Sequence, residues 1–123
     1  MAKTKTKMEQ EISDAVIKFE LEFMGRGPTE TQTFIIDTMI IVRLKGVLTK
    51  AELQLANAGD SDRGRKLIKD VRIELIEKGR PLLDAALESI TGQKIVSLHT
   101  DISTTIGERV IIFTTQHPLD KTP

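Results

Sequence analysis

The segment Gly25-Arg26-Gly27-Pro28-Thr29 has the residue types of an anion-binding loop. Glycines allow a loop to present backbone N–H groups to an anion, and Arg26 adds positive charge. The segment follows a predicted helix, however, whereas a phosphate loop precedes the helix whose N-terminus holds the anion. Two interpretations stay open: a candidate binding loop formed by Gly25, Arg26 and Gly27, or a helix stop with Gly25 as the left-handed cap.

A second candidate site is the run of basic residues between positions 63 and 80. Seven basic side chains occur there against three acidic ones, and Arg65, Lys69 and Arg72 are the candidate binding residues. A basic helix can follow nucleic-acid phosphates or an anionic membrane surface, but such a run is also typical of the solvated side of a helix. The chain has 18 basic and 18 acidic residues and neither Trp nor Tyr, so nucleic-acid binding is the weaker alternative.

The remaining reactive residue types form no recognisable catalytic or metal-binding set. His99 and His117 lie far apart in the sequence, and the chain has no cysteine, which excludes disulfides and thiolate chemistry. Asp101 and Glu108 flank a polar loop, either as a cation or proton site or as ordinary residues of a hairpin end. We expect no catalytic residue, no metal and no cofactor, and therefore a protein that is not an enzyme.

Apolar residues from position 8 to 24 recur at steps of three and four, which predicts a helix. One face of this helix carries Met8, Ile12, Ala15, Val16, Phe19 and Phe23. Ile17, Leu21 and Met24 lie on the opposite face. A helix that is apolar on two sides needs two packing partners. The second partner is either another element of the same chain or a second subunit, and these three residues are the candidate dimer interface.

The other predicted elements alternate in type along the chain. They are strands over 31–36 and 39–45, a short helix from 50, a long helix from about 60 to 90, and strands over 94–100 and 108–115. Asp37 and Thr38 provide the first hairpin turn. Thr49 and Glu52 form a capping box for the short helix. Pro81 lies inside the long helix and is expected to kink it.

This order predicts an α+β fold, α-β-β-α-α-β-β, in which helices pack on one face of a four-stranded antiparallel sheet. We expect a disordered basic tail over 1–7, a single domain over 8–117 and a loose C-terminal tail over 118–123. The apolar share of 39% and charged share of 29% are typical of a globular domain. No apolar run approaches the ~18 residues that span a bilayer. We therefore expect a cytoplasmic protein, peripheral to the membrane if it acts there.

Six short segments follow one another along the chain: GRGPT at 25–29, TFIID at 33–37, MIIV at 39–42, GVLTKAE at 46–52, GR at 64–65 and ITGQKI at 90–95. In this order and spacing they resemble the MpsC family of small bacterial proteins. The resemblance covers residues 8–117, and Pro81 departs from the family's usual pattern. The family name implies an accessory role in a Na+-translocating, membrane-potential-generating system, and no catalytic residue is carried over from it.

These observations give one leading hypothesis and two alternatives. The leading one is a non-enzymatic accessory or regulatory interaction protein, a homodimer that acts on a partner such as a membrane transport complex. The first alternative is a nucleic-acid-binding module that uses the basic helix and the loop at 25–27. The second is a sensor of a small anion or nucleotide, which would use the same loop with Arg26.

Overall fold

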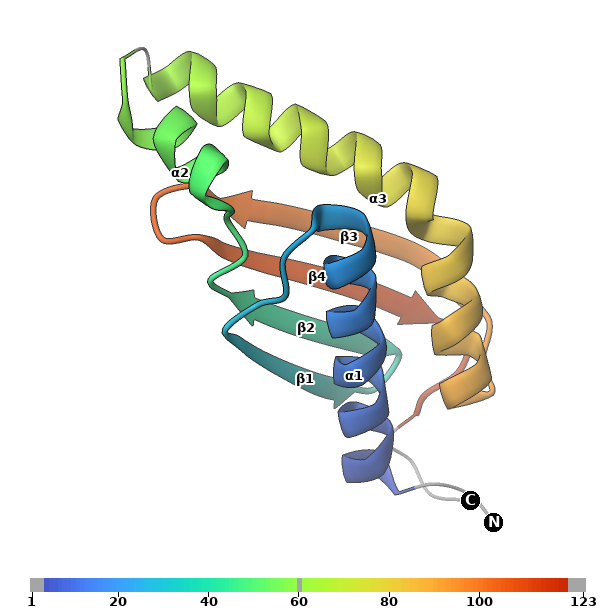
Figure 1. Ribbon diagram of the computed structural model, residues 1–123. Coiled ribbons are helices and arrows are strands. Elements are labelled where there is room, and N and C mark those ends of the chain that lie inside the picture. Colours follow the sequence, from blue (N-terminus) through green and yellow to red (C-terminus); the bar gives the residue numbers. More distant parts are fainter. Residues whose placement is uncertain (1–3, 60, 120–123) are drawn as a thin grey trace.

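The computed structural model describes residues 4–59 and 61–119 of the chain. This part folds in the order α-β-β-α-α-β-β, which confirms the predicted α+β fold. The elements are α1 (Lys5–Met24), β1 (Glu30–Ile36), β2 (Met39–Lys45), α2 (Lys50–Asn57), α3 (Ser61–Thr91), β3 (Ile95–Ser103) and β4 (Glu108–Thr115). The helices of the described residues cover one side of the sheet (Figure 1).

The sheet is antiparallel throughout, with strand order β1-β2-β4-β3. Two hairpins build it, and they meet where β2 pairs with β4 along its whole length. Asp37 takes a left-handed backbone conformation, with φ of 56°, in the two-residue turn between β1 and β2. Strand β3 continues to Ser103 and does not end at Thr100 as predicted, because Ser103 still pairs with Glu108.

The core lies between the sheet and the helices. Alternate residues of the strands point toward the helices, as the two-residue period of a strand requires. The strand side chains of this layer that are fully buried include Ile35, Ile40, Val42, Leu44, Ile111 and Phe113. From the helices, Ile12 and Val16 of α1 and Ile68, Leu83 and Leu87 of α3 pack against them.

Helix α1 begins at Lys5, earlier than the predicted start at Met8. The side-chain oxygen of Thr4 accepts a hydrogen bond from the backbone N–H of Lys7 at 3.1 Å, so Thr4 caps the helix. The prediction of a disordered tail over 1–7 is therefore wrong for residues 4–7. Residues 1–3 lie outside the described part of the chain.

Helix α3 runs through Pro81 without interruption to Thr91. The apolar spacing of the sequence predicts a stripe made of Leu67, Ile68, Val71, Leu75, Leu82 and Ala86, drifting toward Leu83, Leu87 and Ile90. Ile68, Leu83 and Leu87 are buried as this predicts, but Leu67, Val71 and Leu82 are exposed. The residues that are buried are Gly64, Ile68, Arg72, Ile76, Gly79, Leu83 and Leu87. Two glycines lie on this line because the neighbouring helices come too close there for a side chain, and this close approach fixes which face of α3 is buried.

The chain after β4 returns to the first hairpin. The backbone N–H of Leu119 donates to the carbonyl oxygen of Asp37 at 2.9 Å, and its side chain packs against the core. The predicted loose tail over 118–123 is therefore wrong at Leu119. Residues 120–123 lie outside the described part of the chain.

Candidate functional site

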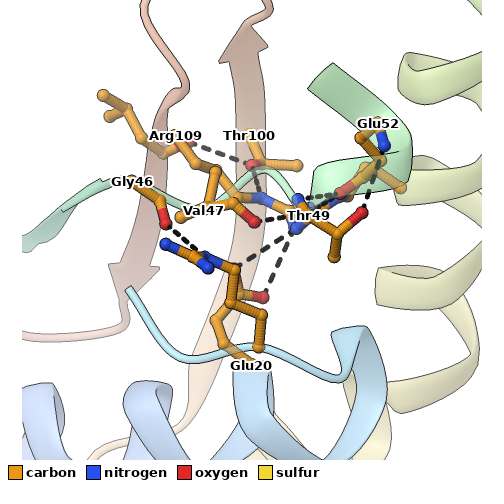
Figure 2. Close-up of polar contacts among 10 residues, drawn as sticks. Glu20, Gly46, Val47, Thr49, Glu52, Thr100 and Arg109 are labelled. Atoms are coloured by element: carbon orange, nitrogen blue, oxygen red, sulfur yellow. Dashed lines mark hydrogen bonds and ion pairs between the residues drawn. The ribbon is translucent and has the colours of Figure 1, made fainter. Parts of the chain in front are cut away.

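Four charged side chains from four elements meet between the helices and the sheet. Glu20 comes from α1, Glu52 from α2, Arg72 from α3 and Arg109 from β4. Glu20, Arg72 and Arg109 are at most 2% exposed, which is rare for ionisable side chains. Figure 2 shows Glu20 and Arg109 approaching from opposite sides, with Glu52 beside them at the start of α2. We call these four residues the buried charge cluster.

Arg72 is the best-bonded member of the cluster. Its Nε and Nη2 donate to the two carboxylate oxygens of Glu52 at 2.8 and 2.6 Å, and Nη2 also donates to the carbonyl oxygen of Val47 at 2.7 Å. The Glu52 carboxylate in turn accepts the backbone N–H of Thr49 at 2.8 Å, which completes the predicted capping box. The Glu52 carboxylate therefore caps the N-terminus of α2 and also joins α2 to α3 through two hydrogen bonds from Arg72.

Glu20 is held more loosely. Its two carboxylate oxygens lie 3.6 Å from Nη1 of Arg72 and from Nη1 of Arg109, within ion-pair distance but beyond hydrogen-bond distance. These oxygens and both Nη1 atoms have no hydrogen-bond partner among the described residues. Burial raises the pKa of Glu20, although the two arginines act to lower it. Burial also lowers the pKa of Arg109.

A small cavity of about 40 Å³ borders the cluster. Its walls include Lys69 and Arg72 from α3 and Thr100, Asp101 and Arg109 from the β3–β4 hairpin. A cavity of this volume is large enough to hold water. The cluster contains two acidic and two basic side chains, so the cluster has no excess of positive charge for an external anion. Its geometry is better suited to holding the helices and the sheet together.

The predicted basic binding surface does not form as expected. Arg72 is buried in the charge cluster, so placing it among the exposed binding residues was wrong. Lys69 lies 3.5 Å from the carboxylate of Asp101. Arg65 is half-buried, and its Nε is enclosed. Arg72 lies in the interior because it is on the buried line of α3 that starts at Gly64. Glu20 of α1 and Glu52 of α2 neutralise its charge there.

The loop at 25–29 serves as a helix stop. Gly25 takes the left-handed conformation, with φ of 77°, directly after the last residue of α1. Arg26 donates from Nε to the carbonyl oxygen of Gly46 at 3.1 Å, which ties the loop to the end of β2. Gly27 lies close against the side chain of Leu21. Of the two interpretations left open by the sequence, these contacts favour the structural one.

The predicted dimer interface on α1 is broken up by the fold. Met24 is buried in the core of its own chain, so it is not available to a dimer interface as predicted. Ile17 is half-buried, and Leu21 packs beside Gly27 although 54% of it stays exposed. The chain reversal after Gly25 brings the loop back against this face, so part of the second apolar stripe covers another element of the same chain.

An apolar surface lies instead on the side of the sheet that faces away from the helices. We call it the open sheet face. Its apolar side chains are Phe34 and Ile36 of β1, Met39 and Ile41 of β2, and Val110 and Ile112 of β4. Phe34, Ile36 and Met39 are 45%, 51% and 38% exposed. An antiparallel sheet with one solvated face normally carries polar residues there, so this face is unusual.

One end of the open sheet face is charged. Lys45 lies 3.5 Å from Glu30, and Arg43 donates from Nε and Nη2 to one oxygen of Glu108 at 3.0 and 2.9 Å. The sequence did not lead us to predict this face. The signal was the unbroken apolar runs at 34–36, 39–42 and 110–113, since continuous runs are typical of strands that are covered on both sides.

Comparison with known protein families matches residues 4–117 to a family described as Na+-translocating membrane potential-generating system (MpsC). The chain belongs to the MpsC family. One MpsC relative is the uncharacterized protein YbcI of Bacillus subtilis (strain 168), which is 41% identical over 121 residues. That match covers 98% of this chain and 95% of the relative. No solved structure gives a significant match.

Among the described residues of this MpsC protein, no helix has a stretch long and apolar enough to cross a bilayer. The same residues contain no group of three or more His, Asp or Glu side chains placed to hold a metal ion.

Proposed function

We propose that this protein is a non-enzymatic accessory or regulatory protein of a Na+-translocating, membrane-potential-generating system, and that it acts by binding another protein chain through the open sheet face. The membrane-potential-generating system in this proposal comes from the description of the family. The open sheet face is the observation that carries the binding role. Contiguous apolar patches on a soluble surface mark interaction sites, because leaving them in water is costly.

The geometry supports this role better than the two alternatives. A nucleic-acid module needs several cationic side chains free to meet phosphates. In α3, Arg72 is buried, Lys66 pairs with Asp70 at 2.9 Å and Arg80 pairs with Asp84 at 3.2 Å. An anion sensor at the loop needs Arg26, which bonds to the carbonyl oxygen of Gly46.

The test is made in the native host, with the gene deleted and returned as variants. The membrane potential of cells growing in Na+-rich medium is followed with a potential-sensitive dye. We expect the deletion to lower the potential and the wild-type gene to restore it. The double variant Phe34→Lys/Met39→Lys, which charges the open sheet face, should fail to restore it.

The control is Leu82→Lys, which places one lysine at an exposed leucine of α3, away from the open sheet face. It should restore the potential fully. An unchanged potential in the deletion strain would contradict the role in this system. Full restoration by the double variant would contradict the use of this face.

A further inference from the structure

We propose that the open sheet face binds a second copy of this chain, so that two sheets stack face to face in a symmetric dimer. This inference names a partner for the surface on which the proposed function rests. It differs from the dimer expected on α1, because here the interface is the sheet and the helices stay on the outside.

The strand pairing sorts the open sheet face into rows that run across the four strands. One row contains Phe34, Ile41, Ile112 and His99, and the row at the turn end contains Ile36, Met39, Thr114 and Ser97. The row at the other end contains Glu30, Lys45, Glu108 and Ser103, next to a row with Gln32, Arg43, Val110 and Asp101. The apolar rows and the charged rows therefore occupy opposite ends of the same face.

A two-fold axis that stacks two identical faces must lie in the plane between them. An axis parallel to the strands, between β2 and β4, keeps each row over the same row of the second copy. It also exchanges β2 with β4 and β1 with β3. Ile41 then lies over the second copy's Ile112, and Phe34 lies over the second copy's His99. The apolar end of one face covers the apolar end of the other.

The charged end is complementary to itself under the same axis. Lys45 lies over the second copy's Glu108, and Glu108 lies over the second copy's Lys45. Arg43 lies over the second copy's Val110, so no cation faces a cation. An axis across the strands would instead put Lys45 over the second copy's Met39 and Arg43 over its Ile41. The axis across the strands therefore buries two cations against apolar side chains, whereas the parallel axis does so for Arg43 alone and gives Lys45 an acidic partner. The parallel axis is favoured.

The size of the face fits a dimer at the lower end of stable interfaces. Four strands about 4.8 Å apart and seven residues of about 3.3 Å each give a flat area of roughly 19 Å by 23 Å. Side chains make the accessible surface larger than this projection, and a standard interface uses about 800 Å² from each partner. We therefore expect a dimer that dissociates on dilution. Aligned sheets also pack within about 30° of each other, which these short strands allow.

The first experiment measures mass in solution by sedimentation velocity from low to high micromolar concentration. The wild-type chain of 13.7 kDa should approach twice that mass at the upper end. Phe34→Lys/Met39→Lys should stay monomeric with an unchanged circular-dichroism spectrum, and Leu82→Lys should behave as wild type. A wild type that stays monomeric, or a double variant that still dimerises, would overturn the inference.

The second experiment tests the direction of the two-fold axis by cross-linking introduced cysteines. The chain has no cysteine of its own, so only the introduced ones can react. In the proposed stack, position 34 lies over position 99 of the second copy, while the two copies of position 34 lie about three strand spacings, roughly 14 Å, apart sideways. A short bis-maleimide should therefore link Phe34→Cys/His99→Cys chains into dimers and leave Phe34→Cys chains unlinked. Linking of Phe34→Cys alone would overturn this axis.

The two proposals fail separately. If the wild type is monomeric but Phe34→Lys/Met39→Lys still fails in cells, the open sheet face binds a different chain and only the dimer is wrong. If the dimer forms as described but deletion leaves the membrane potential unchanged, the proposed function is wrong and the dimer stands.

Discussion

At the scale of single residues, Arg72 and Lys69 show how one basic run divides between two roles. They lie three positions apart on α3, yet Arg72 bonds to Glu52 in the interior and Lys69 meets Asp101 near the surface. The sequence shows the charge of both side chains but not the elements that neutralise them. Glu52 lies 20 positions before Arg72 and Glu20 lies farther still, so only the folded chain brings the cluster together.

The two side chains should therefore differ in their effect on stability. Arg72→Ala leaves Glu20 and Glu52 without their shared partner, and breaking a buried pair in this way costs about 3–5 kcal/mol of unfolding free energy. Lys69→Ala should cost less than about 1 kcal/mol, because its partner Asp101 is largely exposed. Urea unfolding of the two variants measures both values. Equal losses would contradict the division between a buried and a surface role.

The two acids of the cluster should give opposite dependence on pH. Burial raises the pKa of Glu20 above its value in the unfolded chain, despite the nearby arginines. Burial acts in the same direction on Glu52, but the hydrogen bonds from Arg72 and Thr49 outweigh it and lower its pKa. The stabilisation linked to Glu20 is therefore present below its unfolded pKa and is lost as pH rises through the folded one, whereas that linked to Glu52 is lost as pH falls.

Unfolding free energies measured across pH for wild type, Glu20→Gln and Glu52→Gln test this directly. Relative to Glu20→Gln, the wild type should lose stability as pH rises from about 4, the value for an unfolded glutamate. Relative to Glu52→Gln, it should lose stability as pH falls below about 4. Slopes of the same sign for both comparisons would show that one of the two assignments is wrong.

At the scale of elements, the local signals in the sequence are enough to predict most of the fold. The capping box at Thr49, the glycine stop at Gly25 and the two-residue turn at Asp37 act within a few residues, and each forms as predicted. The buried face of α3 was predicted only in part, because it depends on contacts between helices. Ile68, Leu83 and Leu87 are buried as predicted. Leu67 and Leu82 are exposed, because the helix buries the line on which its two interior glycines lie.

Substituting Gly64 or Gly79 of α3 tests how closely the helices pack. A Cβ added to Gly64 would lie 1.9 Å from the carbonyl oxygen of Leu55 in α2, and one added to Gly79 would lie 2.3 Å from the ring of Phe19 in α1. A ring can move aside more easily than a backbone carbonyl. Gly64→Ala should therefore lower the unfolding free energy by at least about 2 kcal/mol, and Gly79→Ala by less.

Alanine is the better helix former by about 1 kcal/mol, so both substitutions would be stabilising if helix propensity alone decided the outcome. Chemical unfolding of the two variants therefore gives a clear sign. A stabilised Gly64→Ala protein would show that α2 and α3 do not pack as closely as the structure has them.

At the scale of the whole molecule, the described part of the chain forms two layers. The helices cover one face of the sheet (Figure 1), while apolar side chains on the other face are exposed to water. The buried charge cluster and the loop at 25–29 both act within the layers that are already formed. The open sheet face is an apolar surface that the fold itself leaves uncovered, and the proposed second copy would cover it.

If only folded chains dimerise, dimerisation should stabilise the folded state. A partner that binds only the folded state stabilises it by an amount that grows with concentration. The midpoint of thermal unfolding, Tm, should therefore rise with protein concentration for the wild type and for Leu82→Lys. For Phe34→Lys/Met39→Lys it should stay constant, because that variant has charge on the surface that would be buried. Calorimetry at several concentrations measures this. A wild-type Tm that does not change with concentration would mean that folding needs no second copy, and the open sheet face would then have to be covered by a different protein.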